Sequence, residues 1–177
     1  MTLAAATCTL LLIDLQQRLM PSIADGDAVV ANAERLARVA QLLDVPIVAT
    51  EQNPAGLGGT VEALAGVPSR TLAKNFFDAT REAAFDDALS ADRGTLVVAG
   101  CETHVCVMQT VLGLLARGRA VALVSDAVGS RRTKNRDAAL ARAKAKGAEL
   151  VTTEMVIFEW LETSDHPRFR EALQVVK

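Results

Sequence analysis

Short, continuously apolar segments that alternate with amphipathic stretches are the feature that most constrains how this chain can fold. Six segments have the length of a β-strand: TCTLLLIDL (7–15), VPIVATE (45–51), RTLAKN (70–75), TLVVAGC (95–101), AVALVSD (120–126) and AELVTT (148–153). Alternation with helices is typical of parallel sheets, and continuous apolar runs are typical of strands covered on both faces. The pattern predicts an α/β fold, a Rossmann-like three-layer α/β/α sandwich with a central, mostly parallel six-stranded sheet.

Amphipathic segments between these runs predict the covering helices. Residues 27–44 place apolar side chains on one stripe, and residues 80–90, 103–117 and 133–146 also have helical length. We expect the tail from Thr153 onward to be helical, and residues 54–59 (PAGLGG) to form a loop. Half of the residues are hydrophobic and no linker is visible, so residues 1–177 are expected to form a single domain.

The composition favours a small-molecule partner. The formal net charge is -2, from 19 basic and 21 acidic residues without a long run of either sign, and there is one Trp and no Tyr. Neither a nucleic-acid nor a membrane partner is therefore expected. The first apolar run has no basic leader and meets Asp14 too soon to span a bilayer. Three cysteines without a CxxC pair indicate free thiols in a reducing compartment, which predicts a cytoplasmic protein.

Ligands of open parallel sheets bind at the carboxyl ends of the strands. The residues that end the predicted strands there are Asp14, Glu51, Lys74, Glu102 and Asp126. Cys106 follows the fourth strand, in the first turn of the predicted helix 103–117. Unpaired N–H groups and the helix dipole favour a thiolate, so we expect the pKa of Cys106 to lie below the ordinary value of about 8.5. The same N–H groups would suit an oxyanion.

These residue types suit nucleophilic catalysis. Asp14 is placed to accept the thiol proton, and Lys74 to stabilise negative charge on the sulfur and on an attacked carbonyl. The neighbouring Gln16 would orient substrate or Lys74. Each residue also has an ordinary structural interpretation, because cysteines are often buried, an Asp after a strand often caps a helix, and lysines are mostly exposed. Cys8 and Cys101 are expected to be structural.

The segments IDLQ (13–16), AKN (73–75) and GCETHVCV (100–107) resemble the three signature segments of isochorismatase-like cysteine hydrolases, in order and over nearly the whole chain. The resemblance implies that Asp14, Lys74 and Cys106 form a catalytic triad. It also implies a cis peptide bond between Cys101 and Glu102, and an oxyanion hole built from the backbone N–H groups of Glu102 and Cys106. Relatives commonly form dimers or larger assemblies, so a homo-oligomer is expected.

Two further segments, residues 50–61 and 158–173, resemble the isochorismatase-domain-containing branch of that family. The candidates for substrate binding are Gln16, Glu51, Glu102 and His104. Asp126 and Arg131 either reach a substrate carboxylate or, as we expect, pair with each other at the surface. Trp160 is a candidate interface anchor.

The chain departs from two branches of the family. The nicotinamidase branch binds a metal through an Asp-x-His pattern and a second His, whereas this chain has only His104 and His166. No metal and no cofactor are therefore expected. Relatives that cleave the vinyl ether of isochorismate generally lack the nucleophile cysteine, so Cys106 favours hydrolysis of an amide-type C–N bond through a thioester.

Two other functions fit the same pattern of elements. A nucleotide-binding Rossmann domain is disfavoured because the first strand runs into DLQQRL without a GxGxxG motif, and the chain has no P-loop. A non-catalytic member of the family, kept as a scaffold or interaction protein, is the alternative that stays open.

Overall fold

Each inner strand of the sheet is apolar on both faces because helices cover it from both sides. The computed structural model describes residues 2–177 and contains one six-stranded sheet. Its strands are β1 (Cys8–Ile13), β2 (Ile47–Gln52), β3 (Arg70–Lys74), β4 (Thr95–Cys101), β5 (Ala120–Gly129) and β6 (Glu149–Val151). They lie in the order β3-β2-β1-β4-β5-β6, and all neighbours are parallel. The predicted α/β/α sandwich is confirmed.

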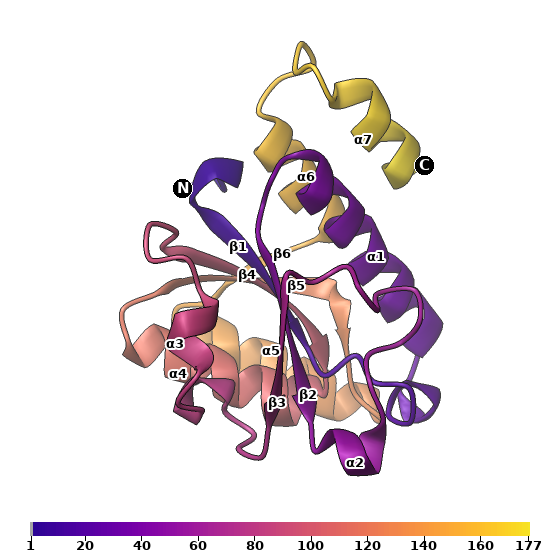
Figure 1. Ribbon diagram of the computed structural model, residues 1–177, viewed down its shortest axis with the longest axis vertical. Helices are drawn as coiled ribbons and strands as arrows, with labels where there is room; N and C mark the ends of the chain where they lie inside the picture. Colours follow the sequence, from indigo (N-terminus) through magenta and orange to yellow (C-terminus); the bar gives the residue numbers. More distant parts are fainter. Residues whose placement is uncertain (1) are drawn as a thin grey trace.

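Two layers of helices enclose this sheet (Figure 1). One face is covered by α1 (Gly26–Leu42) and α6 (Thr153–Leu161), with α7 (Phe169–Val176) packed against them, and the other by α3 (Phe85–Ala88), α4 (Met108–Ala116) and α5 (Thr133–Ala145). Strand β1 shows the division directly. Leu10 and Leu12 pack into the core on the α1 side, whereas Leu11 and Ile13 pack into the core on the α4 side.

The strand order changes direction between β1 and β4. The chain builds β1, β2 and β3 toward one edge and then returns to place β4 on the other side of β1. Crossovers leave such a switch point in opposite directions, which opens a crevice at the carboxyl ends of its two strands. Gly100 lets the strands meet here, because its φ is +127° and a Cβ atom would stand 2.0 Å from the carbonyl oxygen of Ile13.

Three segments differ from their predictions. Residues 80–90 form a 3-10 turn (Ala79–Arg81) and the single turn α3, because Glu82 between them is extended and binds the preceding loop. Residues 54–59, expected as a loop, begin with the single turn α2 (Pro54–Leu57). Strand β5 continues to Gly129, so Asp126 lies inside it and does not end it.

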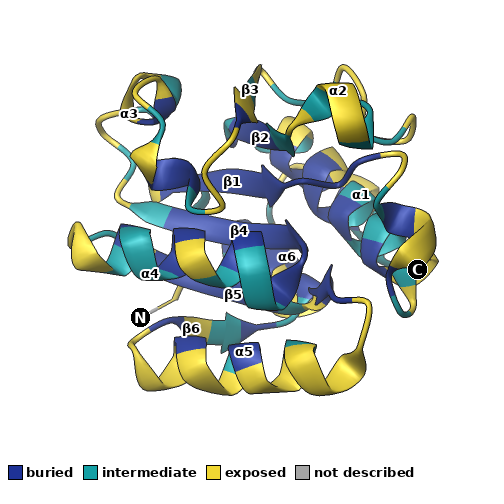
Figure 2. Ribbon diagram, turned by 90° about the horizontal axis from the view of Figure 1, so that it is seen from below, coloured by how far each residue is buried: buried dark blue, intermediate teal, exposed yellow. Residues whose placement is uncertain are grey.

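The exposure of the helices to water differs from one side chain and one face to the next. Trp160 is only 2% exposed and packs in the core near Cys8, so its proposed role as an interface anchor is wrong. Helix α6 carries the indole on the side that faces the sheet. The sequence pattern of the tail did not indicate which side of the helix would face the sheet. Figure 2 shows the buried sheet and the exposed outer faces of the helices, especially of α5. Within residues 2–177 we find no helix of the length and apolarity needed to cross a membrane.

Candidate active site

Asp14 leaves β1 at the switch point. Its backbone is in the left-handed region, with φ at 49°, and its side chain is fully buried. The N–H of Asp14 donates to the carbonyl of Thr50 at 3.1 Å, and the Thr50 hydroxyl donates to Asp14 Oδ1 at 2.7 Å. These bonds fix the carboxylate above the sheet and leave Oδ2 for another partner.

That partner is Lys74, the last residue of β3. Lys74 Nζ lies 2.7 Å from Asp14 Oδ2, and neither side chain has any exposed surface. Nζ also donates to Gln52 Oε1 at 2.6 Å and to the carbonyl of Phe76 at 3.4 Å. A buried ion pair is costly to desolvate and persists where its geometry and further hydrogen bonds compensate. The pair is thus a fixed source of charge in a water-poor site.

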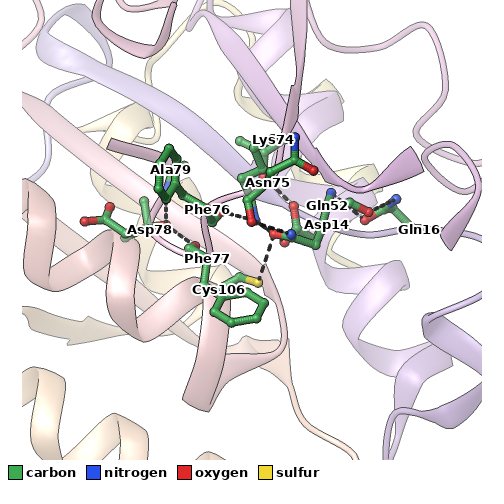
Figure 3. A network of polar contacts seen from close by, with 12 residues as sticks. Asp14, Gln16, Gln52, Lys74, Asn75, Phe76, Phe77, Asp78, Ala79 and Cys106 are labelled. Atoms are coloured by element: carbon green, nitrogen blue, oxygen red, sulfur yellow. Dashed lines mark hydrogen bonds and ion pairs between the residues drawn. The ribbon is translucent and has the colours of Figure 1, made fainter. Parts of the chain in front are cut away.

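Cys106 lies beside this pair, as Figure 3 shows. It belongs to the π-helical turn Thr103–Val107 that leads into α4, is 6% exposed, and its Sγ is 3.9 Å from Gln52 Oε1. Burial, and next the negative charge of Asp14, raise the pKa of the thiol to about 12, although Lys74 opposes the shift. The predicted lowering is therefore wrong, because desolvation and the carboxylate outweigh the helix terminus. At neutral pH the resting sulfur keeps its proton.

Gln52, like Thr50, is a residue of this site that the sequence did not single out. Its amide nitrogen donates to the carbonyl of Asn75 at 2.9 Å, which turns the amide oxygen toward Lys74 and Cys106. Side chains alternate along a strand, so Thr50 and Gln52 face the acid and the lysine while Glu51 faces away. The strand-end rule selected Glu51 because the apolar run stops there, one residue before β2 does.

Two predicted substrate-binding residues contact other parts of the protein. Glu51 accepts hydrogen bonds from the N–H and the hydroxyl of Thr60, at 2.7 and 2.8 Å. Gln16 is fully buried and pairs with the Gln52 backbone, accepting from its N–H at 2.8 Å and donating to its carbonyl at 3.1 Å. Gln16 also donates to the carbonyl of Gly58 at 2.6 Å, so both side chains bind the loop that follows β2. Gln16 thus positions Gln52, and the geometry does not place either residue beside the sulfur.

Glu102 and Arg131 link the turn that carries Cys106 to the loop after β5. The peptide bond between Cys101 and Glu102 is cis, as the resemblance implied. The Glu102 carboxylate accepts from the backbone N–H and from Nε of Arg131, each at 3.0 Å. Burial raises the pKa of Glu102, but the hydrogen bonds and charge of Arg131 outweigh burial and hold that pKa below its ordinary value. Arg131 therefore does not pair with Asp126, which accepts from the N–H and hydroxyl of Thr153.

His104 joins the same two segments. Its Nδ1 is 3.0 Å from the Ser130 hydroxyl and its Nε2 is 3.3 Å from the amide nitrogen of Asn135. Both ring nitrogens are thereby engaged with the loop and the first turn of α5. Together with the Glu102–Arg131 pair, these contacts hold the turn that carries Cys106.

The other two cysteines lie in the core. Cys8 and Cys101 are unexposed, and neither forms a disulfide. Burial raises the pKa of both thiols, that of Cys101 to about 12. This placement agrees with a structural role. Across residues 2–177, no three side chains of the His, Cys, Asp or Glu type are grouped as a metal site would require.

An all-parallel sheet whose switch point gathers a carboxylate, an ammonium and a thiol defines an isochorismatase-like cysteine hydrolase fold. The isochorismatase domain matches residues 8–155. Isochorismatase domain-containing protein 2A of Mus musculus is 39% identical over 168 residues, which are 95% of this chain and 82% of the mouse protein. The chain therefore belongs to the isochorismatase family, and the resemblance seen in its motifs is confirmed.

Solved structures agree with this assignment. A MAR1 ribonuclease from Caenorhabditis elegans superposes with a TM-score of 0.94 at 32% identity, over 99% of this chain and 92% of that one. YcaC from Pseudomonas aeruginosa, solved with hexane-2,5-diol and covalent acrylamide, has a TM-score of 0.88 at 28% identity, over 98% of this chain and 91% of that one. The family is one of hydrolases.

Proposed function

We propose that this protein is a cysteine-dependent hydrolase of a small molecule and that it cleaves an amide-type C–N bond through a thioester. The observation that carries the proposal is the buried Asp14–Lys74 pair beside the Cys106 thiol, at the switch point of the sheet. A scaffold protein has no need of a buried ion pair against a thiol, because such a pair costs desolvation energy.

The proposed reaction begins with a protonated thiol. Asp14 accepts the proton of Cys106 as the sulfur bonds to the substrate carbonyl carbon, so a free thiolate need not accumulate. The carbonyl π electrons move to oxygen, and the N–H groups of Glu102 and Cys106 are the proposed donors to that oxyanion. The C–N bond then breaks, the proton on Asp14 passes to the leaving nitrogen, and a thioester remains.

Hydrolysis of the thioester restores the enzyme. Asp14 removes a proton from a water molecule, whose oxygen bonds to the thioester carbon, and the C–S bond breaks with return of the proton to sulfur. Lys74 holds the carboxylate in place and balances its charge through both half-reactions. Gln52 and Gln16 are positioning residues in this scheme. No step draws on a metal or a cofactor.

Activity measurements with named amides test this proposal. Acetamide, benzamide and N-carbamoylglycine would be incubated with wild-type protein and with the Cys106→Ala, Asp14→Asn and Cys8→Ala variants, and released ammonia would be measured. We expect at least one amide to be hydrolysed, with loss of turnover in the first two variants and full activity in Cys8→Ala. Undiminished hydrolysis by Cys106→Ala contradicts the mechanism.

The scaffold alternative is separated by covalent labelling. Acrylamide, found covalently bound in the Pseudomonas neighbour, is an electrophile that thiols attack. If Cys106 is a nucleophile, acrylamide labels it, and prior binding of a hydrolysed amide slows the labelling. If none of the amides is hydrolysed and Cys106 reacts with acrylamide no faster than buried Cys101, the protein is a non-catalytic scaffold and the hydrolase proposal fails.

A second candidate function, binding of a polyanion such as RNA, is favoured by the charge of α5 and its preceding loop. Residues 131–146 hold seven basic residues and one acidic residue, although the whole chain carries net charge -2. The basic side chains are Arg131, Arg132, Lys134, Arg136, Arg142, Lys144 and Lys146, all exposed except the half-buried Arg136. The Caenorhabditis neighbour is a ribonuclease by name.

Fluorescence anisotropy with a short single-stranded RNA distinguishes this candidate from the expectation of no nucleic-acid partner. Binding through α5 requires affinity that falls steeply with salt and is lost when Arg142 and Lys144 are both changed to Glu. Absence of binding at low salt contradicts it.

We propose a small-molecule partner, a cytoplasmic location and a homo-oligomer. Three free cysteines support the location, and the exposed Met155 and Phe158 on α6 support an interface between copies. Cell fractionation tests the cytoplasmic location. Sedimentation of wild type against Phe158→Glu tests the homo-oligomer.

A further inference from the structure

Large apolar side chains are exposed at two places on the described surface, and one of them adjoins the candidate site. Among residues 2–177 the exposed set is Phe76 (43%), Phe77 (51%), Met155 (45%) and Phe158 (40%). Phe76 and Phe77 come directly after Asn75, which follows Lys74 at the end of β3. An aromatic pair left open to water next to a reactive group is typical of a surface that a ligand covers.

The backbone of this aromatic segment is held in place. One oxygen of Glu82 accepts from the N–H groups of Asn75 and Phe76, at 2.8 and 3.0 Å. These two backbone bonds hold the pKa of Glu82 below its ordinary value, so the carboxylate is charged at neutral pH. The Arg81 guanidinium lies over the Phe76 ring, 4.3 Å from its centroid. The backbone of this segment and the ring of Phe76 therefore have a fixed position in the folded chain.

The next turn of chain is fixed to α4. The Thr110 hydroxyl accepts from the N–H of Ala79 at 3.0 Å and donates to the carbonyl of Phe77 at 3.4 Å. Thr110 lies four residues after Cys106, in α4, which continues the π-helical turn that carries Cys106. One continuous helical segment therefore positions both the aromatic segment and Cys106. In the view of Figure 3 the ring of Phe77 is directed toward the side of the site on which Cys106 lies.

When the sulfur attacks a substrate carbonyl, a ring on this side of the site would face the acyl group that the carbonyl carries. The polar groups of the site, Asp14, Lys74 and Gln52, lie together on one side of Cys106, where the leaving nitrogen and the proton transfers need them. In the view of Figure 3 the Phe77 ring lies on the other side of the sulfur from these groups, and its exposed face offers an apolar, flat surface. Aromatic rings favour stacked or edge-to-face contact with another flat group over contact with a small aliphatic one.

We propose that Phe77 is a specificity-determining residue that packs against the acyl portion of the substrate, and that the substrate class is small amides with a flat, apolar acyl group. The inference rests on the proposed cysteine hydrolase function. It adds a preference among amides, which neither the family nor the position of the triad supplies. The Phe76 ring is covered on one face by Arg81, and we assign it to holding the segment in place and not to contact with substrate.

Acylation by two activated esters tests the preference without knowledge of the natural substrate. p-Nitrophenyl benzoate and p-nitrophenyl acetate have the same leaving group and differ in the acyl group. Release of p-nitrophenolate would be followed for wild type, Phe77→Ala and Phe77→Leu, with the rate of Cys106→Ala subtracted. Phe169→Leu is the matched control, because that half-buried aromatic side chain lies on α7, outside the candidate site and outside the proposed interface on α6.

We expect the benzoate-to-acetate ratio of kcat/KM to fall about tenfold in Phe77→Ala and less in Phe77→Leu, and to stay unchanged in Phe169→Leu. If the ratio is unchanged in both Phe77 variants while Cys106-dependent acylation persists, the inference is overturned and the proposed function stands. If wild type and Cys106→Ala release p-nitrophenolate equally, the proposed function itself fails. An unchanged ratio with dissociation of an oligomer in Phe77→Ala assigns the surface to a second copy of the chain and also overturns the inference.

Discussion

Replacement of Lys74 by Met should destabilise the fold by removing one half of a fully buried ion pair. The Nζ–Oδ2 distance is 2.7 Å and both side chains are inaccessible to water, so the variant leaves the Asp14 carboxylate without its countercharge. Breaking a buried pair in this way costs about 3–5 kcal/mol. Met fills much of the lysine volume, which confines the effect to the charge and its hydrogen bonds.

Urea denaturation at neutral pH measures this cost. With an m value of about 2 kcal/mol per molar urea, the midpoint should fall by about 2 M, with m unchanged. Lys134→Met is the control, because Lys134 is exposed, and its free energy of unfolding should stay within about 0.5 kcal/mol of wild type.

A double-mutant cycle separates the pair from other contacts of Lys74. Asp14→Asn alone leaves a buried ammonium, whereas Asp14→Asn with Lys74→Met leaves neither charge. The double variant should therefore lose less stability than the sum of the singles, by about 2 kcal/mol. A Lys74→Met variant within about 1 kcal/mol of wild type, or an additive cycle, refutes the reasoning that the pair is a coupled, desolvated unit.

Two other outcomes follow from the site geometry. The pKa of Cys106 is raised to about 12, so its alkylation by iodoacetamide should keep accelerating with pH up to pH 9, and Asp14→Asn, which removes a charge that raises this pKa, should speed alkylation at pH 8. A plateau near neutral pH would instead indicate a resting thiolate. Gly100→Ala should unfold the protein or lower its Tm by more than about 10 °C, because the new Cβ meets the Ile13 carbonyl at 2.0 Å. Gly94→Ala, with no atom within 4 Å, should leave Tm nearly unchanged, and equal Tm values for the two variants contradict the packing argument.

The sequence predicts the fold well because its strands are apolar on both faces. A strand such as β1, buried at all six positions, has few alternatives to the centre of a parallel sheet. Once the sheet is parallel, the carboxyl ends of β1 and β3 lie on one edge, and the order β3-β2-β1 brings Lys74 within reach of Asp14 across β2. The pairing of these two side chains is therefore implied by topology together with their positions in the chain.

Other features of the site depend on packing that a sequence pattern does not contain. Whether Glu51 or Gln52 faces the site is decided by the register of β2 within a single residue. The pKa of Cys106 is set by its burial and by the approach of Asp14, both of which come from distant parts of the chain. The helix-dipole argument considered only the local turn. Glu102 likewise found Arg131, from the loop after β5, as its partner.

The most direct test of the account is to trap the acyl-enzyme. Wild-type protein would be mixed with p-nitrophenyl acetate, quenched in acid during turnover and digested, and the acetylated peptide would be identified by mass spectrometry. We predict an acetyl group on Cys106 that forms and decays at rates compatible with turnover, and that is absent from Cys106→Ala. Full turnover without acylation of Cys106, or with the acyl group on another side chain, would contradict it.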